Sequence, residues 1–189
     1  MRWKFLIAAA FFACVSAETR GANQEPPPRG IYLGMTTGPI YFMGASDRRL
    51  YGDSWVVGLR AGYDFFPYLG LEAQVRFSGH DTSRQLSEGP DQIPTSFWAI
   101  QGLAILRGSY PFTRRLSVSA EVGGGTWYTN PNQNPRLRGS YRLMATGGLG
   151  LQYFLRIRSL AMGLDPQLSI VQDLEAPVLQ ATAYIRYTF

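Results

Sequence analysis

The chain has 189 residues, a formal net charge of +5 and 46% hydrophobic residues. This length suits one domain, and the lack of any apolar run near about 20 residues excludes a helix that crosses a bilayer. The basic residues are almost all arginines scattered over turns and strands, whereas a nucleic-acid-binding protein clusters them on one face. We therefore expect no nucleic-acid partner.

The amino-terminal residues 1–17 predict a secretory signal peptide. Arg2 and Lys4 precede an apolar run, and small residues at its end suit cleavage by signal peptidase. Cys14, the only cysteine, lies in this segment, so the cleaved chain would contain neither a disulfide nor a catalytic thiol. Cleavage before Cys14 to give a lipoprotein is the alternative, but residues 11–13 match a lipobox poorly.

Residues 18–29 are polar and rich in proline, which predicts an extended periplasmic segment without a core of its own. From residue 30 to residue 189, apolar and polar side chains alternate, as they do in a β-strand with one face in lipid and the other in a polar interior. The strands are predicted at residues 30–43, 55–66, 69–78, 95–109, 116–128, 140–153, 160–170 and 177–189.

Strands of this length match what a tilted membrane strand needs, and the connections alternate between long and short. The long loops are expected at 44–53, 79–94 and 129–139. A soluble β-sandwich would expose its charged face, yet here the charges share the glycine-rich face opposite Leu, Val and aromatic residues. We therefore predict an all-β fold, an eight-stranded antiparallel up-and-down transmembrane β-barrel over residues 30–189.

Aromatic residues gather near the strand ends and predict two interfacial girdles. The girdle on the side of the long loops is expected to contain Trp55, Phe97, Trp98, Trp127, Tyr128 and Tyr141.

The polar faces of the strands carry charged residues that we expect to form a network inside the barrel. They are Arg60, Asp64, Glu72, Arg76, Glu121, Arg142, Asp165 and Arg186. Side chains fill the interior of an eight-stranded barrel, and a buried charge must be paired, so we predict a closed lumen. On this reasoning, replacing Arg76 or Arg142 would strand a buried partner. A narrow polar path through the lumen is the alternative.

The last nine residues carry a family resemblance. Residues 181–189 alternate, and Ile185, Tyr187 and Phe189 end the chain on an apolar, aromatic face. This stretch resembles the carboxyl-terminal assembly signal of bacterial outer-membrane barrels, and residues 30–189 as a whole resemble the OmpA-type family of small barrels. The chain is also similar to myxobacterial envelope barrels associated with adventurous gliding.

The resemblance implies an outer-membrane protein with both termini in the periplasm. Its expected partners are outer-membrane lipids and lipopolysaccharide, the barrel assembly machinery, and envelope proteins of a motility or adhesion complex. A structural or surface-interaction role is expected rather than catalysis.

The sequence offers weak evidence for other chemistry. His80 is the only histidine and is expected in the long polar loop 79–94 near Ser83 and several acids. Barrels that modify lipid A use His with Ser and a carboxylate, but a loop is the wrong place for such a site. One histidine provides no metal-ligand spacing, and the glycine runs lack the Lys-Ser/Thr pair of a phosphate loop. We therefore expect no catalytic residues, no metal and no cofactor.

Overall fold

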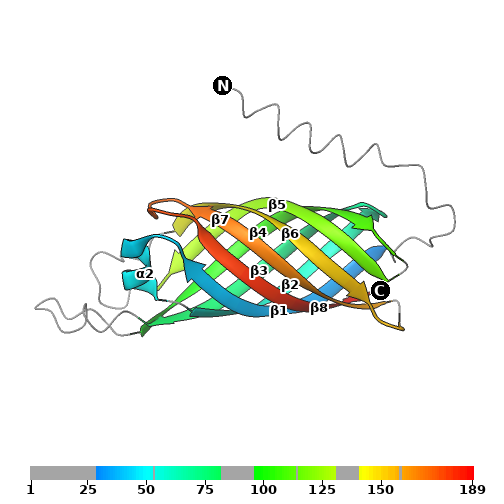
Figure 1. The fold of residues 1–189 in the computed structure, drawn as a ribbon, viewed down its shortest axis with the longest axis horizontal. Coiled ribbons are helices and arrows are strands. Elements are labelled where there is room, and N and C mark those ends of the chain that lie inside the picture. The colour runs from blue at the N-terminus through cyan, green and yellow to red at the C-terminus, as the bar shows by residue number, and fades with distance from the viewer. Residues whose placement is uncertain (1–28, 53, 82–95, 114, 131–140, 158) are drawn as a thin grey trace, which may run out of the picture.

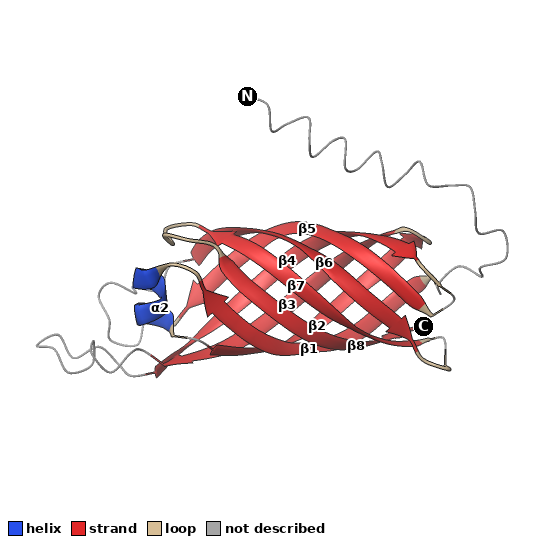
Figure 2. Ribbon diagram, in the orientation of Figure 1, coloured by secondary structure: helices blue, strands red, loops and turns tan. Residues whose placement is uncertain are grey.

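The computed structural model describes residues 29–52, 54–81, 96–113, 115–130, 141–157 and 159–189. Eight strands form one closed antiparallel barrel in which each strand pairs with the next and β8 pairs with β1 (Figures 1 and 2). The strands are β1 (Gly30–Phe42), β2 (Ser54–Phe66), β3 (Leu69–Asp81), β4 (Ser96–Pro111), β5 (Leu116–Thr129), β6 (Tyr141–Phe154), β7 (Leu160–Val171) and β8 (Val178–Thr188). The predicted fold class is confirmed.

The barrel has two different ends. One end carries the short helix α2 (Ala45–Tyr51), and the other carries the start of β1 and the carboxyl terminus (Figure 1). We call these the helix end and the terminal end. The connections at the terminal end are short, whereas those at the helix end include the long segments 82–95 and 130–140.

The outer wall is apolar and the interior is polar. Large apolar side chains such as Leu59, Leu143 and Ile170 point away from the barrel and are more than half exposed. Along β8 every second residue from Val178 to Thr188 is buried, and the residues between them are exposed or, at Leu179, half-buried, as the sequence pattern predicted. The wall therefore has the exposed apolar belt that suits a lipid environment.

Helix α2 replaces part of the loop predicted at 44–53. A seven-residue helix is too short to be stable alone, and its pattern is too short to recognise in a sequence. It forms here because its last residue, Tyr51, is buried in the mouth of the barrel. No helix in the described part of the chain is both long and apolar enough to cross a membrane.

Inward-facing glycines leave room for large side chains on neighbouring strands. A Cβ atom on Gly163 would lie 2.4 Å from the ring of Tyr184, and one on Gly62 would lie 2.3 Å from the hydroxyl of Tyr32. On the inner face of the strands, long polar and aromatic side chains therefore pack into the space that the glycines leave.

The predicted signal peptide, residues 1–17, and nearly all of the predicted extension, residues 18–29, lie outside the described residues. Both stay predictions.

Candidate functional site

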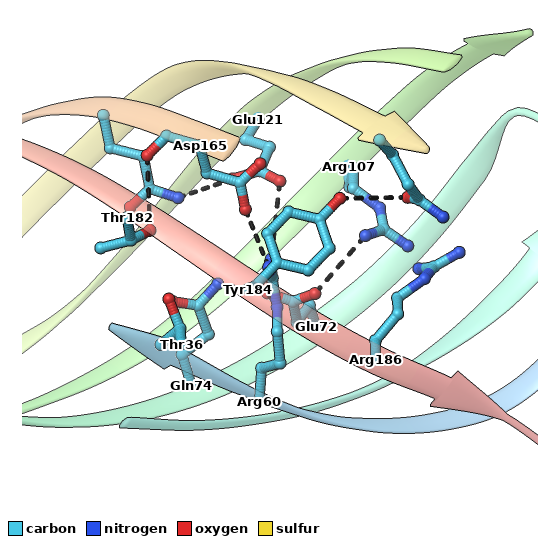
Figure 3. Close-up of polar contacts among 12 residues, drawn as sticks. Thr36, Arg60, Glu72, Gln74, Arg107, Glu121, Asp165, Thr182, Tyr184 and Arg186 are labelled. Carbon is cyan, nitrogen blue, oxygen red and sulfur yellow. Dashed lines mark hydrogen bonds and ion pairs between the residues drawn. The ribbon is translucent and has the colours of Figure 1, made fainter. Parts of the chain in front are cut away.

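The interior of the barrel holds a central charge network built around Arg60 (Figure 3). Its guanidinium donates to Glu72 Oε1 from Nη2 at 2.7 Å and from Nε at 3.1 Å, and to Asp165 Oδ2 from Nη1 at 2.8 Å. Glu121 Oε1 lies 3.8 Å from Nη2. The side chain of Arg60 has no exposed surface, so one buried cation serves carboxylates from three other strands.

A second group of charges continues the network toward the terminal end. Arg107 donates to Asp64 Oδ1 at 2.9 Å and lies 3.6 Å from Glu72, and Arg186 reaches Asp64 Oδ2 at 3.3 Å. Tyr32 donates its hydroxyl proton to Glu72 at 2.7 Å. These contacts tie β1, β2, β3, β4 and β8 together across the lumen.

Aromatic rings lie against three of the guanidinium groups. Arg60 lies 4.0 Å from the ring centre of Tyr184, and Arg186 and Arg107 lie 4.4 Å and 5.0 Å from that of Tyr32. Such contacts stabilise a desolvated cation by about 2 kcal/mol. The network is therefore both ion-paired and tightly packed.

The structure brings together six of the eight charges that the sequence placed in the lumen. They are Arg60, Asp64, Glu72, Glu121, Asp165 and Arg186. Sequence reasoning left Arg107 out of the network, although it lies on the same inward face of its strand as Gln101. Because both faces of that strand carry apolar residues, the alternation of polar and apolar residues did not show which face points inward.

Arg76 and Arg142 were expected in the charge network and do point inward, but they join no ion pair with a described carboxylate; the cost of replacing them stays a prediction. Arg76 donates to the amide oxygens of Gln180 and Gln167, the latter at 2.8 Å. Arg142 donates to the hydroxyl of Tyr51. The reason is register, because the strands place amides and an aromatic residue around these two arginines rather than acids.

The mouth at the helix end is filled by an aromatic cluster. It consists of Phe42, Tyr51, His80, Phe97 and Trp127. The Tyr51 ring stacks on Phe42 with 4.8 Å between ring centres and meets Phe97 and Trp127 edge-on. Phe97 and Trp127 were expected in the lipid-facing girdle, but both are buried inside the barrel.

Asp47 fixes helix α2 to the connection that leads into β8, the strand that pairs with β1. Its carboxylate accepts hydrogen bonds from the backbone N–H groups of Glu175, at 2.9 Å, and Ala176, at 3.4 Å, just before β8. Burial raises the pKa of the Tyr51 phenol, so Tyr51 stays neutral near pH 7. The helix therefore closes this end with a neutral aromatic plug held at two points.

His80 lies in β3 and not in the long loop where the sequence placed it. Strand β3 continues three residues beyond the predicted end, and the ring stacks on Phe97 with 5.2 Å between centres. Nε2 of His80 lies 2.8 Å from Ser78 Oγ, and Nδ1 lies 3.2 Å from the carbonyl oxygen of Tyr51. This is the contact pattern of a nucleophile and its base, but both side chains are about 1% exposed, which keeps any substrate away from the hydroxyl.

Among the described residues, no group of three or more His, Cys, Asp and Glu side chains is arranged to hold a metal ion. Ser83 and the other polar residues of 82–95 lie outside the described part of the chain.

The closed barrel, its exposed apolar wall and its polar interior define a transmembrane β-barrel. The chain belongs to the outer membrane protein beta-barrel domain family, whose model matches residues 5–186. The family places the protein in the bacterial outer membrane. The narrower resemblances, to OmpA-type and to gliding-associated barrels, stay predictions.

Solved structures show the same fold at low sequence identity. The chain is similar to Neisserial surface protein A, with a TM-score of 0.57 and 11% identity over 85% of this chain and 97% of that one. It is also similar to the outer membrane protein OprG from Pseudomonas aeruginosa, with a TM-score of 0.55 and 12% identity over 88% of this chain and all of that one. Comparison with curated proteins finds no match.

Proposed function

We propose that this protein is a non-enzymatic barrel with a closed lumen, and that it works as a structural or surface-interaction protein through its helix end. The observation that carries the proposal is the filled interior. The charge network occupies the middle of the barrel, and the aromatic cluster occupies the mouth at the helix end. Near the terminal end, a cavity of about 10 Å³ beside Asp64 and Arg186 has room for about one water molecule.

In this proposal the helix end faces the outside and both termini lie in the periplasm. The longer connections are all at the helix end, as expected of the external side of outer-membrane barrels. Loops carry recognition while strands hold them in place, so the partners would bind there. We expect lipopolysaccharide and envelope proteins as partners, the latter in a motility or adhesion complex, and the barrel assembly machinery during insertion.

The proposal is tested by where changes to the protein impair its function. Removal of residues within 83–94 or within 132–139 should leave the barrel inserted and abolish the cellular phenotype that the intact gene restores. Glu121→Gln, a lumen variant that keeps the shape of the side chain, should restore the phenotype fully. Both are compared at equal outer-membrane abundance.

A narrow pore is the second candidate, because polar side chains line the lumen along most of its length. Protein reconstituted in planar bilayers should show little steady conductance if the first proposal is right. Large, stable, ion-selective currents, or full rescue by both loop deletions together with loss of function in folded lumen variants, would reject it in favour of the pore.

A further inference from the structure

Four inward-facing residues form a continuous row across β3, β4, β5 and β6. The strand register pairs Arg76 directly with Gln101, Gln101 with Trp127, and Trp127 with Arg142. We call Arg76, Gln101, Trp127 and Arg142 the donor row. It begins beside the aromatic cluster, because Arg142 is the second residue of β6 and bonds to Tyr51, and it ends at mid-barrel with Arg76.

Each member of the donor row has a buried N–H group without a hydrogen-bond partner among the described residues. These groups are Arg76 Nε, Gln101 Nε2, Trp127 Nε1 and Arg142 Nε. A buried donor without an acceptor is rare and costs about 1 to 3 kcal/mol. Four of them in adjacent positions of one row therefore call for a common explanation.

The amide orientation of Gln101 follows from its neighbours. Arg76 donates to Gln180 Oε1, and Gln180 Nε2 donates in turn to Gln101 Oε1 at 3.1 Å. Turning the Gln101 amide over would place two N–H groups against each other. Its Nε2 group is therefore held as a donor without a partner among the described residues, in the position that pairs with Arg76.

Neither cation of the row forms an ion pair with a carboxylate of a described residue. Arg76 is bonded to two neutral amides, one of which, Gln167, links it to the carboxylate of Glu121. Arg142 is bonded to the Tyr51 phenol, which burial keeps neutral. The described strands direct more arginines than acids into the lumen. The arginines are Arg60, Arg76, Arg107, Arg142 and Arg186, and the acids are Asp64, Glu72, Glu121 and Asp165.

We propose that the donor row binds a small monovalent inorganic anion, of the halide class, inside the lumen beneath the aromatic cluster. A monovalent anion accepts from several N–H groups at once and offsets the one positive charge by which these five arginines exceed the four acids, which a water molecule does not. The proposal rests on the donor row alone and does not depend on the function proposed above.

A matched pair of variants tests the site. Gln101→Glu places a fixed carboxylate in the donor row, and Gln74→Glu makes the same change in a buried lumen glutamine whose Nε2 already donates to Glu72. The midpoint of urea unfolding is measured for the full barrel in detergent, in chloride and in gluconate at equal ionic strength. Gluconate is too large to enter the closed lumen.

For the unaltered protein, the midpoint is expected to be higher in chloride. Gln101→Glu should abolish this difference and raise the midpoint in gluconate above that of the unaltered protein, because it supplies the missing charge. Gln74→Glu should keep the chloride effect and lower the midpoint in both salts. Equal midpoints in the two salts for the unaltered protein would overturn the proposal.

Fluorescence gives a second measurement that needs no unfolding. In a variant with Trp127 as its only tryptophan, made by changing Trp3, Trp55 and Trp98 to Phe, iodide should quench the emission with a saturable dependence on concentration. Gln101→Glu in that background should remove the saturable part. Quenching that is absent or strictly linear in iodide would show that water alone occupies the row.

Discussion

Replacing Arg60 by methionine should destabilise the barrel more than any other single change of a lumen charge. Methionine keeps much of the length of the side chain but removes its cation. Glu72 would keep hydrogen bonds from Tyr32, at 2.7 Å, and from Gln74, with Arg107 at 3.6 Å. Asp165 would lose the only hydrogen bond that its carboxylate receives from a described residue.

The expected loss in the free energy of unfolding follows from what happens to the Asp165 carboxyl group when its partner is removed. Stranding one buried partner of an ion pair costs about 3 to 5 kcal/mol. The carboxyl can avoid this cost by taking up a proton, and for a group of ordinary pKa about 3.9 this costs about 4 kcal/mol at pH 7. We therefore expect Arg60→Met to lower the free energy of unfolding by about 4 kcal/mol at pH 7.

The same reasoning sets the pH dependence. The folded variant holds a proton that the unfolded chain releases above about pH 4, so the loss of stability should shrink by about 1.4 kcal/mol for each pH unit from 7 toward 4. Adding Asp165→Asn to Arg60→Met should recover most of the loss, because no charge is then stranded there. Urea unfolding in lipid vesicles measures these values, with Arg115→Met at an exposed turn as the control. A loss below about 1 kcal/mol at pH 7, or no recovery in the double variant, would refute the reasoning.

Three further predictions concern packing and assembly. Tyr51→Ala should destabilise the barrel by about 3 to 5 kcal/mol and speed tryptic cleavage after Arg48, whereas Tyr51→Phe, which keeps the ring, should leave cleavage slow. Gly163→Ala should cost about 1 to 3 kcal/mol because its Cβ would meet the Tyr184 ring and the Leu151 carbonyl, whereas Gly79→Ala, with no atom within 4 Å, should change urea stability little. Removal of Phe189, which donates its backbone N–H to Ile31 at 2.9 Å, should slow assembly and increase digestion by periplasmic proteases, and an unchanged rate in pulse-chase experiments would contradict this.

The strands could be predicted from the sequence because lipid on one side and a polar lumen on the other impose a period of two along nearly every strand. The same rule placed Arg60, Glu72 and Asp165 inside the barrel. It was weakest on β4, where Phe97, Leu103 and Ile105 also face inward, so that neither face looks polar. Arg107 and the inward direction of Phe97 were missed for that reason.

The helix end could not be predicted because long-range contacts decide it. Tyr51 is buried by residues from β1, β3, β4 and β5, and the sequence around Tyr51 does not predict contacts with such distant strands. His80 and Asp81 look like the start of a polar loop, yet His80 lies in the barrel because Tyr51, Ser78 and Phe97 surround it. Helix α2 and the end of β3 thus stabilise each other, and the sequence of either segment alone does not predict its secondary structure.

The buried polar groups that lack a hydrogen-bond partner differ in kind along the axis of the barrel. This difference explains how a closed lumen can contain an anion site. Among the described residues, those toward the helix end are the N–H donors of the donor row, and those around Arg60 include acceptor oxygens of Gln74, Glu121 and Asp165. Toward the terminal end they are again N–H groups, on Arg107 and Arg186. An anion that enters past Tyr51 would gain hydrogen bonds as far as Arg76 and would then face carboxylates, which repel it. The donor row is therefore expected to end in a barrier, so the lumen can hold an anion without conducting it.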